Sequence, residues 1–243
     1  MKKALILLSA LLGVLNSFAE GNTFEGNLTL TSDKNGTVAG KNVLAVKNDL
    51  VAIDPGVGQQ MVLNVKTGDF FTVVNQGGQK MVAKLNVSVL SNLSEMPSFL
   101  GPFSNHLGGK SDESEVKATD EVKTISGYKC KKYIVKDAET VSTIWAAQDF
   151  PFSLAPLMDL LKATGSTNPA LKASFPMQAS VKSTKTNDVT GFSVAVEKKA
   201  LDDKLFTLPA DLLVMDMTPL VQQMLQTNDP AQITKVLNSL IPK

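Results

Sequence analysis

The chain has 243 residues, with 24 basic and 23 acidic side chains and a formal net charge of +1. Every one of the 24 basic residues is a lysine, so the chain lacks the bidentate arginine fork that suits phosphate and nucleic-acid recognition. The near-neutral charge also gives no electrostatic footprint for nucleic acid. These properties argue against a nucleic-acid-binding protein and against a phosphoryl-transfer enzyme.

The first nineteen residues have the three parts of a secretory signal peptide. Lys2 and Lys3 form a positive n-region, residues 4–15 are mostly apolar, and Ala19 ends a small-residue cleavage site before Glu20. The apolar stretch is shorter than the ~20 residues of a spanning helix, which makes an uncleaved anchor the weaker alternative. Since no cysteine follows the expected cut, we expect a periplasmic or extracellular protein without a lipid anchor.

After cleavage, residues 20–243 are expected to form one domain. The single cysteine, Cys130, allows no internal disulfide, so the apolar core must hold the fold. A chain of roughly 220 residues is long enough to bury a large core.

Residues 22–90 alternate apolar and polar side chains with a period of two, as in Phe24, Leu28 and Leu30. This period indicates strands with one buried face. Asn35-Gly36 is a strong hairpin signal because both central residues of a type I′ turn need positive φ. Residues 91–114 break the pattern with prolines and glycines, which predicts either a flap over one end of the sheet or an ordinary connection.

The second half continues the strands and adds short helices. The pattern predicts strands at 116–125, 128–135, 141–147, 177–185 and 189–198, and helices at 153–163, 219–226 and 230–240. Strands and helices do not alternate regularly, so a parallel sheet is not expected. The predicted class is mainly β with some α (α+β), built on a long antiparallel sheet.

Catalytic and metal-binding patterns are weak. His106 is the only histidine and lies in a glycine-rich segment, so we interpret it as a surface residue. Lysines flank Cys130 and could activate its thiol, but a buried, inert cysteine is the favoured interpretation. One histidine and one cysteine cannot form a standard zinc set, and the acidic pairs lack the spacing of a calcium loop. We therefore predict no enzyme activity, no metal and no cofactor.

The stretch Thr124–Tyr133, followed by Trp145, resembles the signature of the domain of unknown function 4412 family of exported bacterial proteins. Phe24–Gly26, Lys66–Gly68 and Leu205–Pro209 are also similar to that family. The family in turn resembles the LolA/LolB-like superfamily of lipoprotein carriers. This resemblance implies a curved, open antiparallel half-barrel whose concave face is covered by short helices and whose apolar hollow holds acyl chains. The arginine associated with lipoprotein release in the carrier has no counterpart here.

The resulting hypothesis is a non-enzymatic exported protein that binds a lipid or other apolar ligand in such a hollow. The helices at 153–163 and 219–240 would act as plug or lid. Strand parity and side-chain size select six candidate lining residues: Met61, Leu63, Phe71, Met81, Trp145 and Met177.

Two alternatives remain open. One is an interaction module of the cell envelope with a packed interior, which would bind a partner protein at a sheet edge or at 91–114. The other is an enzyme that uses Cys130.

Overall fold

The computed structural model describes residues 22–53, 60–76, 78–92, 115–160, 171 and 173–226. This part of the chain is mainly β and forms one large open sheet with a few short helices. No helix within it is long and apolar enough to cross a membrane. The expected signal peptide, His106, most of the 91–114 segment and the expected helix at 230–240 lie outside the described residues.

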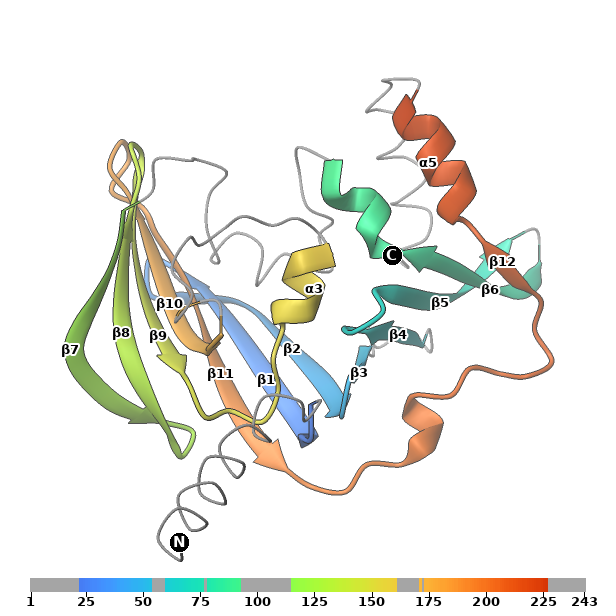
Figure 1. The fold of residues 1–243 in the computed structure, drawn as a ribbon, viewed down its shortest axis with the longest axis horizontal. Coiled ribbons are helices and arrows are strands. Elements are labelled where there is room, and N and C mark those ends of the chain that lie inside the picture. Colours follow the sequence, from blue (N-terminus) through green and yellow to red (C-terminus); the bar gives the residue numbers. More distant parts are fainter. Residues whose placement is uncertain are drawn as a thin grey trace, which may run out of the picture.

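The strands carry the labels of Figure 1. In chain order they are β1 (Glu25–Lys34), β2 (Thr37–Lys47), β3 (Leu50–Ile53), β4 (Met61–Asn64), β5 (Asp69–Gln76), β6 (Gln79–Asn86), β7 (Glu115–Ile125), β8 (Tyr128–Lys136), β9 (Thr140–Ala147), β10 (Phe175–Ser183), β11 (Val189–Lys198) and β12 (Val214–Asp216). The short helices are η2 (Val87–Asn92), α3 (Ala155–Leu160), η4 (Asp203–Leu205) and α5 (Thr218–Gln226).

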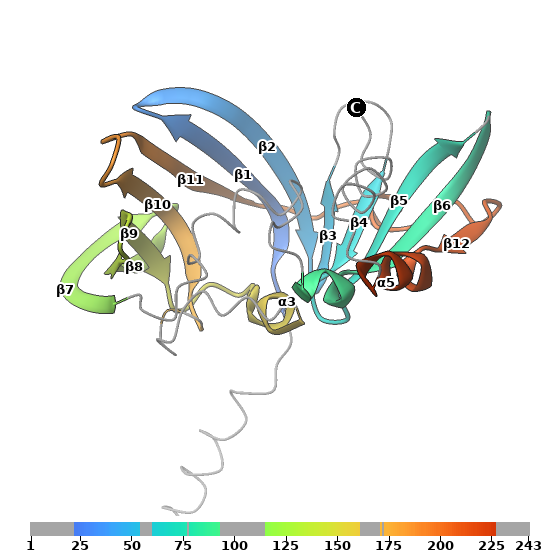
Figure 2. The same ribbon diagram turned by 90° about the horizontal axis from the view of Figure 1, so that it is seen from above.

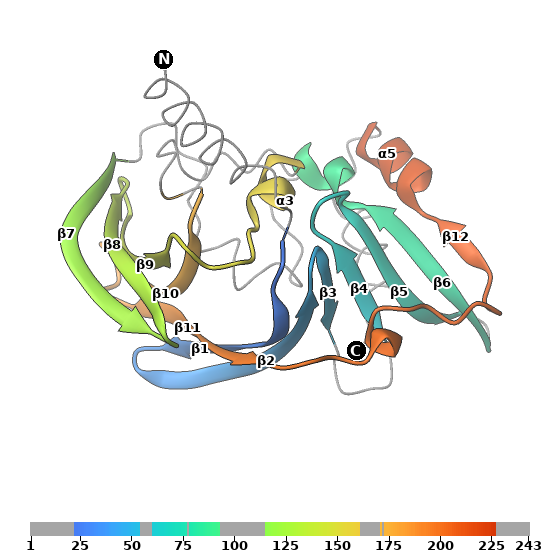
Figure 3. The same cartoon turned by 60° about the horizontal axis from the view of Figure 1, so that its bottom comes forward.

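The sheet runs in the order β12-β6-β5-β4-β3-β2-β1-β11-β10-β9-β8-β7. Its neighbouring strands are antiparallel except β12, which pairs in parallel with β6. The β1–β11 pair joins the two antiparallel halves. The sheet bends strongly, so that β7–β10 and β3–β6 form two walls with β11, β1 and β2 between them (Figures 2 and 3).

The hairpin turns have the backbone geometry that their residues favour. Asn35 and Gly36 have φ of 52° and 78°, and Ser126 and Gly127 have φ of 49° and 85°. Such pairs of positive φ values match the right-handed twist of the flanking strands. The hairpin predicted at Asn35-Gly36 is therefore confirmed, and Gly127 belongs to a turn.

The main apolar core lies on one face of the sheet, to which β1 contributes alternate residues. Leu28 and Leu30 are buried, and the register places Leu44 and Val196 beside Leu28 on the neighbouring strands. A smaller cluster on the opposite face consists of Ala52, Val62 and Phe206. The sheet thus has a large apolar face and a small apolar patch behind its β3–β4 part.

Phe206 belongs to a strap, residues 199–213, that connects β11 to β12 across the sheet (Figure 3). The Gln60 side-chain amide donates to the carbonyls of Lys204, Leu205 and Thr207 at 3.0, 2.7 and 3.0 Å. Lys47 Nζ lies 2.7 Å from Asp203, which adds an ion pair to the strap.

Leu157 of α3 and Val221 of α5 are buried in the main core. The Ser153 hydroxyl accepts from the Ala155 amide at 3.1 Å and satisfies a free donor at the start of α3. At Gly68, with φ of 75°, an added Cβ would lie 2.8 Å from Leu160 Cδ1, so only glycine allows α3 to approach here. The predicted helices are confirmed at 155–160 and 218–226.

Candidate functional site

Three of the six predicted lining residues lie in one buried cluster. Met61, Leu63 and Met177 are 4%, 4% and 0% exposed and belong to the main core. Met61 and Leu63 come from β4, and Met177 comes from β10 in the other half of the sheet. The bend of the sheet therefore brings residues from both halves into one apolar interior.

Phe71 lies on the other face of the sheet. In the β4–β5 pair Phe71 is opposite Val62, whereas Phe70 is opposite Leu63 and is 2% exposed. Lys84 Nζ lies 5.8 Å from the Phe71 ring centroid, a cation–π distance. The residue of β5 that shares a face with Met61 and Leu63 is thus Phe70, not Phe71.

Trp145 lies between lysine side chains. Lys123 Nζ is 4.2 Å and Lys132 Nζ is 5.8 Å from its ring centroid. Lys123 also donates to Gln178 Oε1 at 2.6 Å, and Lys132 pairs with Glu121 at 2.7 Å. The ring is half-buried and packs against the main core, but its surroundings are cationic as well as apolar.

Met81 is half-buried at the β5–β6 hairpin, opposite Val74. The register puts Met81 on the same face as Met61. Its partner Val74 lies two residues along β5 from Thr72, the partner of Met61. Met81 therefore lies toward the rim of the apolar face.

Thr72 is a residue that sequence reasoning missed. It is 0% exposed, and its hydroxyl has no hydrogen-bond partner among the residues that the structure describes. The register places it between Met61 of β4 and Ala83 of β6, both of which are buried. A buried polar atom within an apolar face is a feature that binding sites use to orient a ligand.

Aromatic rings fill the interior near α3. The Phe150 ring centroid lies 5.1 Å from that of Phe24, 4.6 Å from that of Phe175 and 4.8 Å from that of Tyr128. The Tyr128 hydroxyl is buried and, like that of Thr72, forms no hydrogen bond with the described residues. These contacts explain how residues 149–154, which lead into α3, are fixed on the sheet.

Cys130 has the environment of a structural cysteine. Its side chain is 0% exposed, and Sγ donates to the Tyr128 carbonyl at 3.4 Å. Burial raises the pKa of the Cys130 thiol, and this outweighs the opposite influence of the Ile125 backbone and Lys123. This environment disfavours the thiolate that a nucleophile needs. Among the residues that the structure describes, no group of three or more His, Cys, Asp or Glu could hold a metal ion.

The fold and this interior define a mainly β protein built on one large, open and bent sheet. The chain belongs to the family described as Domain of unknown function (DUF4412), whose model matches residues 24–212. A search of the curated proteins found no match.

Several solved structures are similar at low identity. PNGF-II has a TM-score of 0.43 at 14% identity, and the match covers 83% of this chain and 32% of that one. A LolA superfamily protein from Nitrosomonas europaea has a TM-score of 0.29 at 12% identity, over 77% of this chain and 91% of that one. A DUF1329 family protein from Desulfovibrio piger has a TM-score of 0.23 at 9% identity, over 80% and 93%. The chain thus spans 32% of the PNGF-II chain.

Proposed function

We propose that this chain is an exported, non-enzymatic protein of the cell envelope that binds a lipid or other apolar ligand against the large apolar face of its sheet. The observation that carries the proposal is Thr72, whose buried hydroxyl lies between Met61 and Ala83 and has no hydrogen-bond partner within the described part of the chain. An unsatisfied buried polar group is unfavourable by about 1–3 kcal/mol. A ligand with a polar atom at the end of an apolar chain would satisfy this hydroxyl and remain in contact with its apolar neighbours.

The helices would serve as a displaceable cover. Leu157 of α3 and Val221 of α5 bury apolar side chains in the main core. Burying one such side chain contributes about 1.5–3 kcal/mol. Since each buried CH₂ group contributes about 0.8 kcal/mol, two to four methylenes of a ligand would roughly offset the loss of one such contact.

Export is part of the same proposal. Residues 1–19 have the composition of a signal peptide, so we expect the mature chain to begin at Glu20. Intact-mass measurement of the protein recovered from the periplasm would test this. A mass that corresponds to the full 243 residues would contradict cleavage.

A second candidate is an envelope interaction module with a packed interior. It is favoured by exposed apolar side chains along one edge of the sheet and the adjoining helix: Leu213, Val214, Met215 and Leu220, which are 68%, 53%, 39% and 43% exposed. A stoichiometric protein partner recovered by cross-linking in periplasmic extract, with no bound lipid, would favour this candidate.

The ligand proposal is tested by native mass spectrometry and by displacement of an apolar fluorescent probe with fatty acids. Thr72→Val keeps the shape of the side chain and removes the hydroxyl, so it should weaken displacement by fatty acids about tenfold, as expected for loss of one hydrogen bond to a charged group. Thr29→Val is the matched control, because Thr29 alternates with Leu28 and Leu30 and lies on the other face. The proposal fails if neither bound lipid nor probe displacement is detected.

A further inference from the structure

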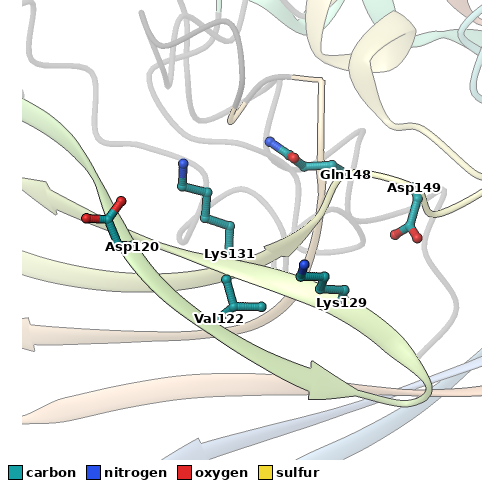
Figure 4. Close-up of a pocket in the computed structure, with 6 residues that line it drawn as sticks. All are labelled: Asp120, Val122, Lys129, Lys131, Gln148 and Asp149. Carbon is teal, nitrogen blue, oxygen red and sulfur yellow. The ribbon is translucent and has the colours of Figure 1, made fainter.

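A polar pocket lies on the β7–β8 hairpin and the chain that follows β9. It has a volume of about 480 Å³ and is lined by Asp120, Val122, Lys129, Lys131, Gln148 and Asp149. In the view of Figure 4 the two aspartates lie at opposite sides, with the two lysines and Gln148 between them. The volume falls within the range of small-molecule sites, which is about 300–1,000 Å³.

The four charged groups of this pocket do not neutralise one another. Within the described part of the chain, none of them forms an ion pair or a side-chain hydrogen bond. Their neighbours on the same strands differ in this respect. Lys132 pairs with Glu121, and Lys123 donates to Gln178. The pocket is therefore lined by two lysines and two aspartates that are not paired within the described part of the chain.

This arrangement selects the charge pattern of a ligand. A simple anion would be attracted by the two lysines but repelled by the two carboxylates. A simple cation would be attracted by the carboxylates but repelled by the lysines. A zwitterion satisfies both sets. Because the aspartates flank the lysines in Figure 4, a matching ligand carries its ammonium to one side of its anion.

We propose that this pocket binds a phosphoethanolamine group. Its phosphodiester would accept from Lys129 and Lys131, because ammonium donors form charge-assisted hydrogen bonds to phosphate oxygens. The Gln148 amide donates to the Tyr133 hydroxyl at 3.3 Å, and its second N–H would donate to the phosphodiester. The primary ammonium of the ligand would donate to Asp120 or Asp149. Such a group occurs in the headgroup of phosphatidylethanolamine and in free glycerophosphoethanolamine.

The site stands independently of the apolar-ligand proposal, because its ligand needs no acyl chain. Titration of the mature protein with glycerophosphoethanolamine, followed by NMR, tests it directly. We expect saturable shifts at residues 120–131 and 148–149, and binding at least fivefold tighter than that of either glycerol 3-phosphate or ethanolamine.

Single substitutions test the contributions of the lysines and of the aspartates separately. Lys131→Gln should weaken glycerophosphoethanolamine binding about tenfold, which corresponds to one charge-assisted hydrogen bond. Asp149→Asn should weaken it too, yet strengthen the binding of glycerol 3-phosphate by removing a repulsive carboxylate. Lys132→Gln is the control, since Lys132 is already paired with Glu121 and should leave the affinity unchanged.

Vesicles identify the source of the group. Phosphatidylethanolamine vesicles that sediment the wild-type chain but not Lys131→Gln would identify a lipid headgroup, and binding of the soluble compound alone would identify a free metabolite. The proposal is overturned if neither form binds, or if Lys131→Gln and Lys132→Gln have equal effects.

Discussion

Thr72 lies directly opposite Met61 in the β4–β5 pair, and no described residue forms a hydrogen bond with its buried hydroxyl. A hydroxyl that has left water without gaining a new hydrogen bond lowers the stability of the fold.

Thr72→Val should therefore raise the free energy of unfolding by about 1 kcal/mol, as measured by urea denaturation. The matched variant Thr29→Val, on the other face of β1, should change it by less than about 0.5 kcal/mol. A loss of stability in Thr72→Val would mean that the hydroxyl is satisfied in the ligand-free protein.

Phe70 and Phe71 should differ sharply in their contribution to stability. Phe70 is 2% exposed in the main core, whereas Phe71 lies on the other face near Lys84. Phe70→Ala should lower the free energy of unfolding by about 3–5 kcal/mol, as expected for a buried aromatic residue. Phe71→Ala should lower it by about 1 kcal/mol, because mainly partial burial and a cation–π contact are lost. Equal losses in the two variants would contradict the observed strand register.

Cys130 should be unreactive in the native state. Its thiol is fully buried, and burial raises its pKa, so little thiolate is available at neutral pH. Thiol reagents should label the chain stoichiometrically in denaturing urea and leave it unlabelled under native conditions over the same period. Rapid labelling of the Cys130 thiol in the native protein would contradict this prediction and support a cysteine nucleophile.

The turn between β8 and β9 should contribute to acid sensitivity through Asp137. Burial acts to raise the pKa of Asp137, but hydrogen bonds from the Thr140 hydroxyl and from the Glu139 and Thr140 amides outweigh it and hold the pKa below its ordinary value. A lowered folded-state pKa stabilises the protein above the unfolded-state pKa of about 4, and this stability is lost as the pH falls through the folded-state value.

Asp137→Asn keeps an acceptor oxygen but cannot titrate. The unfolding free energy of this variant should fall less steeply than that of the wild type between about pH 5 and pH 2. The difference should persist in high salt, because hydrogen bonds rather than distant charges lower this pKa. Parallel pH profiles for the two proteins would contradict this assignment.

The sequence predicted most of the sheet because its signals are local. Alternation marks β1, and pairs such as Asn35-Gly36 fix hairpins through their positive φ values. The three-residue strand β12 was not predicted, since it is too short to display a period and depends on the strap to reach β6.

The candidate site was less predictable because it depends on register. Phe70 and Phe71 are both apolar, so the alternating pattern alone does not reveal which of the two rings is buried. The strand register places Phe70 opposite the buried Leu63, and Phe70 is the buried ring. Thr72 shares its face with Phe70, and a threonine in a strand gives no local signal that it is buried. The lysines beside Trp145 come from β7 and β8, and no local signal reports such a contact across strands.

The most direct test of the central claim is native mass spectrometry of the mature chain, purified without detergent from the periplasm. The account predicts a second species heavier by the mass of one lipid-sized apolar molecule, which free fatty acid displaces and Thr72→Val depletes. A single species at the mass of residues 20–243, unchanged after incubation with fatty acids, would contradict it.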